Sequence, residues 1–232
     1  MKLLVISDLH ANNSVLDKLD AEFKACDAVI FGGDFAECFK PETGKSALDA
    51  LCKKHDNIFA VLGNCDNEAF MDELENADIC AEKSLVYFDG LGISGSGGGT
   101  YFTGKTEFER SEEEILEDYA VVENAVKENN DESLWHNLIL ISHNPPKADI
   151  VDKVNETLHA GSQKFTDFIK EKQPLCVVCG HIHEGVGIEK IGETTVINPG
   201  ALGEKGSFVL LEIEKSSDGN WKVLNAELKT AF

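Results

Sequence analysis

The chain has 232 residues, of which 42% are hydrophobic and 27% charged, a composition that excludes disorder over most of its length. Its 21 basic and 42 acidic residues give a formal net charge of −21. Long-range repulsion from such a surface disfavours general nucleic-acid binding and binding to anionic membranes. The length is typical of one α/β domain, and we expect a single domain over residues 1–232.

The seven cysteines are scattered along the sequence without the spacing of a disulfide framework. We therefore expect free thiols and a cytoplasmic location. Cys176 and Cys179 form a C-x-x-C, but this segment is typical of a buried strand, so core cysteines are favoured over a zinc or redox pair. The apolar run at residues 3–6 is too short for a signal peptide or a membrane span.

The first 62 residues alternate between two patterns. Short apolar runs predict buried strands over residues 3–6, 28–31 and 58–62. Apolar residues at helical spacing predict a helix that begins at Asn13 or Ser14 and a second helix over residues 45–54. This β-α-β-α-β order predicts a parallel sheet with right-handed crossovers.

The middle of the chain has a different character. Residues 84–88 and 91–94 predict a hairpin around Asp89-Gly90, and a glycine-rich loop follows over residues 94–100. The acidic stretch at residues 107–132 predicts one amphipathic helix over residues 111–128. An ordinary packed helix is the favoured interpretation of that stretch; a cover over the site and a partner-binding surface are the alternatives.

The last third returns to strand patterns. Buried strands are predicted over residues 138–141 and 175–178, with a helix around Phe165 and Ile169 between them. Residues 186–191, 194–197 and 208–213 are typical of consecutive antiparallel strands, and residues 221–228 of one more.

Polar side chains follow the predicted strands at the points where the strands end. Because the carboxyl ends of parallel strands meet at one edge of a sheet, we expect these side chains to gather there. Two carboxylates, one amide and four imidazoles form a mixed ligand set that suits two divalent ions, with Asp34 as the bridging ligand. The predicted metal ligands are Asp8, His10, Asp34, Asn64, His143, His181 and His183.

The order of these blocks, D-x-H, G-D, G-N-C-D, H and G-H-x-H, resembles the calcineurin-like metallophosphoesterase superfamily. The cysteine of the third block resembles a small prokaryotic phosphodiesterase-like branch of it. The resemblance implies an α/β fold with mixed sheets in a four-layer α/β/β/α sandwich. It also implies that Asp8, His10, Asp34 and His183 hold one metal and that Asp34, Asn64, His143 and His181 hold the other. A hydroxide that bridges the metals would then attack phosphorus in line, with Asp34 and Asn64 in the catalytic machinery.

One position departs from the usual family pattern. Cys65 stands where many members carry a histidine that stabilises the transition state or protonates the leaving group. A thiol is a poorer proton donor than an imidazolium, so we expect a phosphodiester to be hydrolysed better than a monoester. Either Cys65 or His159 is a candidate for the missing role, and a surface or helix-capping histidine is the alternative interpretation of His159.

The glycine-rich loop suggests one further contact. We expect the backbone at Gly97 and Gly98 to contact substrate, with a plain loop near the site as the alternative. The expected partner is a small phosphoester, and the expected cofactors are two divalent ions: Mn, Fe, Zn or Ni. The rival hypothesis is a metal-binding interaction scaffold with weak or no activity on the same fold. The sequence does not indicate the oligomeric state.

Overall fold

The computed structural model describes residues 1–102 and 104–232 and contains two large mixed sheets. In the first, with strand order β13-β12-β1-β2-β3, the strands are β1 (Lys2–Ile6), β2 (Ala28–Phe31), β3 (Ile58–Ala60), β12 (Ser207–Lys215) and β13 (Trp221–Thr230). In the second, with order β10-β11-β9-β8-β5-β4, they are β4 (Val86–Phe88), β5 (Leu91–Ser96), β8 (Leu138–Ser142), β9 (Cys176–Val178), β10 (Gly187–Ile191) and β11 (Thr194–Asn198).

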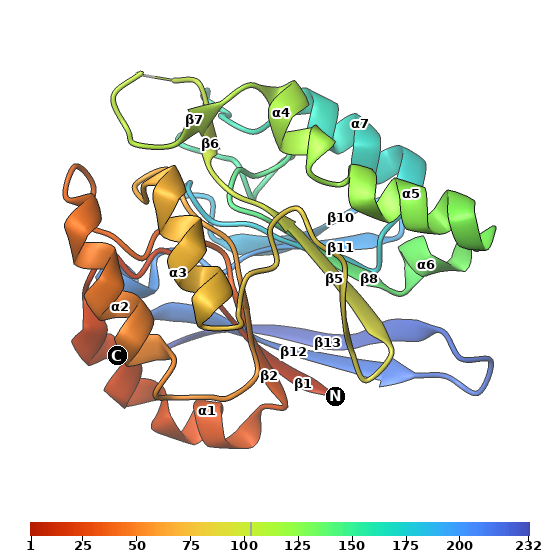
Figure 1. Cartoon of the computed structure of the whole chain (residues 1–232), viewed down its shortest axis with the longest axis horizontal. Helices are drawn as coiled ribbons and strands as arrows, with labels where there is room; N and C mark the ends of the chain where they lie inside the picture. The colour runs from red at the N-terminus through yellow and green to blue at the C-terminus, as the bar shows by residue number, and fades with distance from the viewer. Residues whose placement is uncertain (103) are drawn as a thin grey trace.

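Helices cover the outer faces of both sheets. Beside the first sheet lie η1 (Asn13–Leu19), α1 (Asp20–Ala25), η2 (Pro41–Thr43), α2 (Gly44–Leu51), η3 (Glu68–Phe70) and α3 (Met71–Asn76). Beside the second lie α4 (Glu112–Glu117), α5 (Ala120–Asn129), α6 (Ser133–His136) and α7 (Gln163–Lys172). Figure 1 shows the two sheets face to face between these helices, which confirms the predicted four-layer α/β/β/α sandwich.

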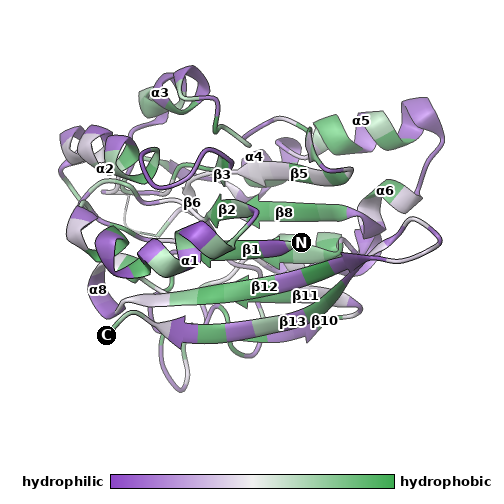
Figure 2. Cartoon of the chain, turned by 90° about the horizontal axis from the view of Figure 1, so that it is seen from below, coloured by the Kyte–Doolittle hydropathy of each residue, from purple (hydrophilic) through white to green (hydrophobic). Residues whose placement is uncertain are grey.

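The alternation of side chains along β1 explains the layers. Leu4 and Ile6 pack in the core under η1, α1 and α2, whereas Leu3 and Val5 pack between the two sheets. Both faces of this strand are therefore buried, as its continuous apolar run predicts. Figure 2 shows the same hydrophobic character along β8, while β12 and the edge strand β13 are mixed.

The acidic middle segment packs as a helical layer. Val122 and Val126 of α5 are buried in a third core with Phe165 of α7. This placement confirms the favoured interpretation of an ordinary packed helix, but the single helix predicted over residues 111–128 is wrong. The chain breaks between α4 and α5 at Asp118, whose carboxylate pairs with Arg110 at 2.6 Å, and Tyr119, whose hydroxyl donates to the Ile141 carbonyl.

The predicted run of consecutive antiparallel strands near the C-terminus is also wrong. β10 and β11 are antiparallel neighbours, but β12 pairs with β1 in the other sheet. Between them the chain crosses from one sheet to the other through α8 (Leu202–Lys205), where the Leu202 amide donates to the Ser7 carbonyl. This crossing joins the two sheets next to the carboxyl end of β1.

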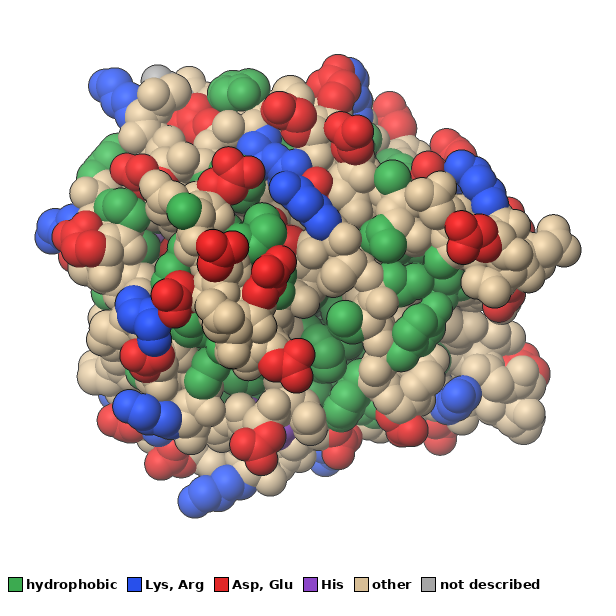
Figure 3. All heavy atoms as spheres, in the orientation of Figure 1, with side chains coloured by type: hydrophobic (Ala, Val, Ile, Leu, Met, Phe, Trp, Pro, Cys, Tyr) green, Lys and Arg blue, Asp and Glu red, His purple; other side chains and the backbone are tan. Residues whose placement is uncertain are grey.

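The parallel strands set the position of the site. β1, β2 and β3 are parallel neighbours in the first sheet, and β5, β8 and β9 are parallel in the second. In Figure 3 acidic side chains are spread over the whole visible face with lysines among them. Among the described residues, no helix has the length and apolar character needed to cross a lipid bilayer.

Candidate metal centre

Strand ends from both sheets deliver the predicted ligands to one place. Asp8 and His10 follow β1, Asp34 follows β2, and Asn64 follows β3, whereas the histidines at 143, 181 and 183 follow strands of the second sheet. Four of the seven have left-handed backbone conformations, which L-residues with side chains adopt rarely: Asp8 (φ 55°), His10 (φ 46°), Asp34 (φ 61°) and His181 (φ 67°). Such conformations cluster where the surrounding structure fixes functional side chains.

One group of donor atoms forms around Asp8. The Nε2 atoms of His10 and His183 lie 3.1 Å apart, and His183 Nε2 lies 3.3 Å from Asp8 Oδ1. Asp34 Oδ2 lies 3.7 Å from His10 Nε2. The donor atoms of Asp8, His10 and His183 are all within 4.8 Å of one another, a span that suits a single cation.

A second group forms on the other side of Asp34. His143 Nε2 lies 3.5 Å from Asp34 Oδ2 and 3.0 Å from Asn64 Oδ1. The ring of His181 is centred 5.2 Å from that of His143. Asp34 Oδ2 therefore faces metal-ligand atoms of both groups. Asp34 Oδ1 accepts a hydrogen bond from the Cys65 amide at 2.8 Å.

Three of the imidazoles are fixed through their Nδ1 atoms. The Nδ1 atoms of His10 and His143 lie 3.0 Å from the Ala36 carbonyl and 2.7 Å from the Gly32 carbonyl. The Nδ1 of His183 lies 3.2 Å from Glu204 Oε2. When such a ring is neutral, its Nδ1 donates a hydrogen bond to the oxygen, and its Nε2 lone pair points into the centre. Lone pairs that converge beside carboxylates need a cation, so the donor set fits divalent metal ions.

The electrostatics of the centre favour positive charge. Burial opposes a charged imidazole, but the Asp34 carboxylate raises the pKa of His143 to about 9. The hydrogen bond with Asp8 likewise outweighs burial and raises the pKa of His183 to about 9. Burial also opposes ionisation of Asp8, yet its hydrogen bond with His183 holds the Asp8 pKa below its usual range. The Asp8 and Asp34 carboxylates thus stabilise positive charge in the centre, whether it is carried by a protonated imidazole or by a metal ion.

The Asp66 carboxylate holds the two ligand-bearing loops of the first sheet together. Its oxygens accept hydrogen bonds from the Phe35, Ala36 and Gly63 amides, with N···O distances of 3.2, 2.8 and 2.8 Å. Asp66 is fully buried, and burial together with the nearby Asp34 charge raises its pKa to about 7. The sequence places Asp66 in the G-N-C-D block, but its three amide contacts depend on the fold.

The glycine-rich loop reaches the centre through one residue. A Cβ added at Gly99 would lie 3.2 Å from Asn64 Cβ and 3.3 Å from the His181 ring. The Gly98 amide, in contrast, donates to the Leu62 carbonyl, and Gly97 packs against buried Glu82. The substrate contacts at Gly97 and Gly98 stay a prediction, with the Gly98 amide already bonded to the Leu62 carbonyl.

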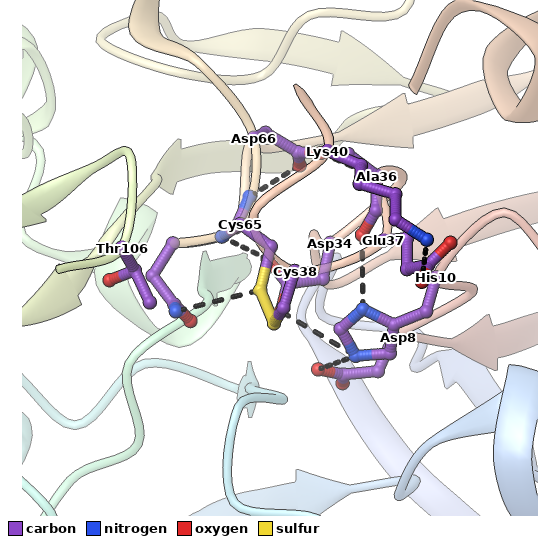
Figure 4. Close-up of a disulfide and its surroundings, with 12 residues drawn as sticks. Asp8, His10, Asp34, Ala36, Glu37, Cys38, Lys40, Cys65, Asp66 and Thr106 are labelled. Carbon is purple, nitrogen blue, oxygen red and sulfur yellow. Dashed lines mark hydrogen bonds and ion pairs between the residues drawn. A yellow bond between two sulfur atoms is a disulfide. The ribbon is translucent and has the colours of Figure 1, made fainter. Parts of the chain in front are cut away.

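The expectation that all cysteines are free is wrong. Cys38 and Cys65 form a disulfide next to the centre, and the five other cysteines are free (Figure 4). No spacing rule indicates this pair, because Cys38 lies in an irregular turn and is brought to Cys65 only by the packing of two loops. Cys176 and Cys179 are buried in the core, as predicted.

His159 belongs to the long loop after β8. Its Nδ1 lies 2.8 Å from Oδ1 of the fully buried Asp152, and 29% of its side chain is exposed. Asp152 also accepts the Ala148 and Gly161 amide protons, so it holds the loop together. His159 is thus oriented by a carboxylate, but its side-chain partner is Asp152 and not a predicted metal ligand.

Most of the chain matches a known protein family. Residues 1–216 match the calcineurin-like phosphoesterase superfamily domain. The chain belongs to this superfamily. Its members are metal-dependent phosphoesterases, and this chain has Asp and His groups that could bind divalent metal, among them Asp8 with His10 and His183, and Asp8 with Asp34 and His143.

Individual proteins and solved structures are also similar to this chain. An uncharacterized protein of Methanocaldococcus jannaschii is 33% identical over 208 residues, which cover 86% of this chain and 88% of that protein. The crystal structure of TT1561 from Thermus thermophilus has a TM-score of 0.72 at 18% identity and covers 100% of this chain and 99% of that chain. A putative 5'-nucleotidase from Staphylococcus aureus has a TM-score of 0.63 at 16% identity and covers 99% of this chain but 54% of its own. At these identities the two structures show the shared fold alone.

Proposed function

We propose that the protein is a dinuclear metal-dependent phosphoesterase that hydrolyses a small phosphodiester in preference to a monoester. The observation that carries the proposal is the convergence of Nε2 lone pairs and carboxylates at the edge where both sheets end. Asp8, His10, Asp34 and His183 would hold one ion, and Asp34, Asn64, His143 and His181 the other. Two ions so held supply activation of water and neutralisation of the phosphoryl oxygens.

Asp34 has the geometry expected of the shared ligand. Its Oδ1 is occupied by the Cys65 amide, so Oδ2 is the oxygen that faces His10 and His143. The side chain is only 3% exposed, and this burial prevents competition from bulk water. We therefore place Asp34 between the two ions and expect its substitution to affect both.

The preference for a diester is supported by the group next to Asn64. Cys65 is bonded to Cys38 in the structure and holds no proton to donate, and the usual histidine is absent. A substrate with a good leaving group needs less help from an acid. His159, oriented by Asp152, is the proposed proton donor, and Cys65 can share this role only when it is reduced.

The metals and the setting belong to the same proposal. Imidazole and carboxylate ligands accept Mn²⁺, Fe²⁺, Zn²⁺ and Ni²⁺, and we propose Mn²⁺ as the first to be tested. The five free thiols support a cytoplasmic setting.

The proposal is tested by steady-state hydrolysis of bis-p-nitrophenyl phosphate and p-nitrophenyl phosphate with each metal. The expected result is metal-dependent turnover, faster on the diester, that Asp34→Asn abolishes and the exposed Asp49→Asn leaves unchanged. His159→Gln is expected to slow turnover without changing metal content. Metal-loaded protein that hydrolyses neither ester nor a cyclic nucleotide would overturn the proposal and favour the interaction scaffold.

A further inference from the structure

Two sulfur atoms lie next to the candidate metal centre, and in the disulfide they take no part in the function proposed above. Cys38 comes four residues after Asp34, and Cys65 directly follows Asn64. Their Cα atoms are 4.8 Å apart, and the disulfide joins the loop after β2 to the loop after β3 (Figure 4). Because both loops carry predicted ligands, the state of these sulfurs bears directly on the centre.

His10 supplies a third donor to the same place. A ring nitrogen of His10 and the sulfurs of Cys38 and Cys65 all lie within 4.8 Å of one another. The Nδ1 of this ring donates to the Ala36 carbonyl, so the nitrogen that offers a lone pair is Nε2. Two sulfurs and an imidazole nitrogen are the donors that Zn²⁺ and Cd²⁺ favour, whereas Mn²⁺ favours oxygen.

We propose that Cys38, Cys65 and His10 form a second cation site, for a thiophilic divalent ion, that is closed by the disulfide and opened by its reduction. A disulfide sulfur has no negative charge and is a weak ligand, so the oxidised chain offers the ion only the imidazole. Reduction frees two thiolates beside that imidazole and changes the local donors from nitrogen and oxygen to nitrogen and sulfur.

A dithiol can reduce the Cys38–Cys65 disulfide by two successive thiol–disulfide exchange steps. One reductant thiolate attacks Cys38 Sγ and breaks its bond to Cys65, which leaves as a thiolate. The second reductant sulfur then displaces Cys38 and closes the reductant's own disulfide. Two electrons pass from the dithiol to the protein sulfurs, together with the two thiol protons, and these protons are released to solvent when the ion binds.

The surroundings explain why Cys38 is the sulfur that reacts first. Cys38 is half-buried in a tight turn closed by the bond from the Lys40 amide to the Glu37 carbonyl, whereas Cys65 is 1% exposed. A reductant therefore reaches Cys38 before Cys65. The preceding residues are held by Asp66, which binds the Phe35 and Ala36 amides, so the loop keeps its place when the disulfide opens.

The observed distances suit a cation once the sulfurs separate. Zinc lies about 2.3 Å from a thiolate and about 2.0 Å from an imidazole nitrogen, so its ligand atoms are separated by less than twice those lengths. The three donors already lie within 4.8 Å of one another, so only a small rearrangement is needed to reach these separations. Rotation of the half-buried Cys38 side chain is the movement needed.

The two cation sites exclude each other at His10. The same Nε2 lies 3.1 Å from His183 Nε2 and faces Asp8 and Asp34. One lone pair binds one ion, so a thiophilic ion at the cysteines removes His10 from the proposed pair of catalytic metals. The inference shares this residue with the proposed function, but its readouts are sulfur chemistry and cadmium absorption, so each can fail without the other.

The first experiment measures the redox state of the full-length protein. The chain is treated with glutathione disulfide or with dithiothreitol, denatured, alkylated and digested, and the peptides are identified by mass spectrometry. We expect a Cys38–Cys65 crosslink after oxidation and alkylation of both Cys38 and Cys65 after reduction, with Cys80 alkylated in both samples. Alkylation of Cys38 and Cys65 in the oxidised sample would overturn the proposal.

The second experiment uses Cd²⁺ alone as the probe. We expect the reduced protein to develop thiolate-to-cadmium charge-transfer absorption and the oxidised protein to lack it. Cys38→Ser should lower this absorption at least twofold in the reduced state. Cys80→Ser, which changes a half-buried free cysteine outside the ligand groups of the described chain, should leave it unchanged. Equal absorption in reduced wild type and Cys38→Ser, or in both redox states of wild type, would overturn the proposal.

Discussion

The Nε2 atoms of His10 and His183 lie 3.1 Å apart, although 173 positions separate the two residues in the sequence. Each ring gives its Nδ1 proton to another group, the Ala36 carbonyl or the Glu204 carboxylate. Two nitrogen lone pairs at this distance repel each other unless a proton or a metal ion lies between them. The fold therefore holds the two nitrogens where either a proton or a metal ion is needed between them.

Metal binding is expected to stabilise the folded chain. An ion that binds the native state alone adds about 2.7 kcal/mol to the free energy of unfolding at a free concentration one hundred times its dissociation constant. Thermal unfolding followed by circular dichroism, with chelator and then with excess Mn²⁺, measures this gain. Asp34→Asn should lose most of the gain because Asp34 faces both groups of donors. An equal gain in wild type and Asp34→Asn would show that the ions bind elsewhere.

Glu204 is expected to act as a positioning residue for His183. Glu204→Gln keeps the size of the side chain but removes the carboxylate that accepts the Nδ1 proton at 3.2 Å. Loss of such a partner commonly weakens metal affinity about 10–100-fold. Competition with a metallochromic chelator measures the affinity, and Glu184→Gln, an exposed position next to His183, gives the same loss of charge. Equal affinities in the two variants would assign the effect to charge and not to position.

The sequence predicts the site better than the connections around it. Asp8, Asp34 and Asn64 follow short apolar runs. Such a run predicts a strand buried on both faces, and the structure contains these strands, so the residues that follow them are placed correctly at the sheet edge. The break at Asp118 has no periodic signal, because it depends on the ion pair between Asp118 and Arg110 on the two sides of α4.

The route of β12 into the first sheet was predicted wrongly for a related reason. Its alternating pattern is typical of a strand that follows β11, and nothing in that pattern names the strand with which it pairs. The pairing is fixed by contacts with β1, where Leu4 lies opposite Leu210. The Cys38–Cys65 disulfide is a further example, because each cysteine looks isolated until Asp66 brings the two loops together.

Buried Glu82 is expected to make stability fall as the pH rises. Burial raises its pKa from 4.5 to about 7, so the native state keeps this proton where the unfolded state has lost it. The contribution is fully present below pH 4.5 and is lost through about pH 7, a change of about 3 kcal/mol. Glu82→Gln should flatten this part of the profile.

The measurement for Glu82 is urea unfolding of the metal-free protein between pH 4.5 and pH 8. The difference between wild type and Glu82→Gln isolates Glu82 from Asp66, whose pKa burial also raises to about 7. The exposed Glu128→Gln serves as the control and should give the wild-type profile. A Glu82→Gln profile as steep as that of wild type would contradict the assignment.

The close approach of Gly63 to Asp34 is expected to tolerate no side chain. A Cβ at Gly63 would lie 2.3 Å from the Asp34 amide nitrogen, a backbone atom that cannot rotate away, so Gly63→Ala must displace one ligand-bearing loop. We expect this variant to lose about 1–3 kcal/mol of unfolding free energy and at least tenfold in Mn²⁺ affinity, measured by urea unfolding and isothermal calorimetry. Gly44→Ala is the control, because its methyl group meets no atom nearer than 3.3 Å. Wild-type affinity in Gly63→Ala would mean that the Asp34 carboxylate does not depend on this contact for its position.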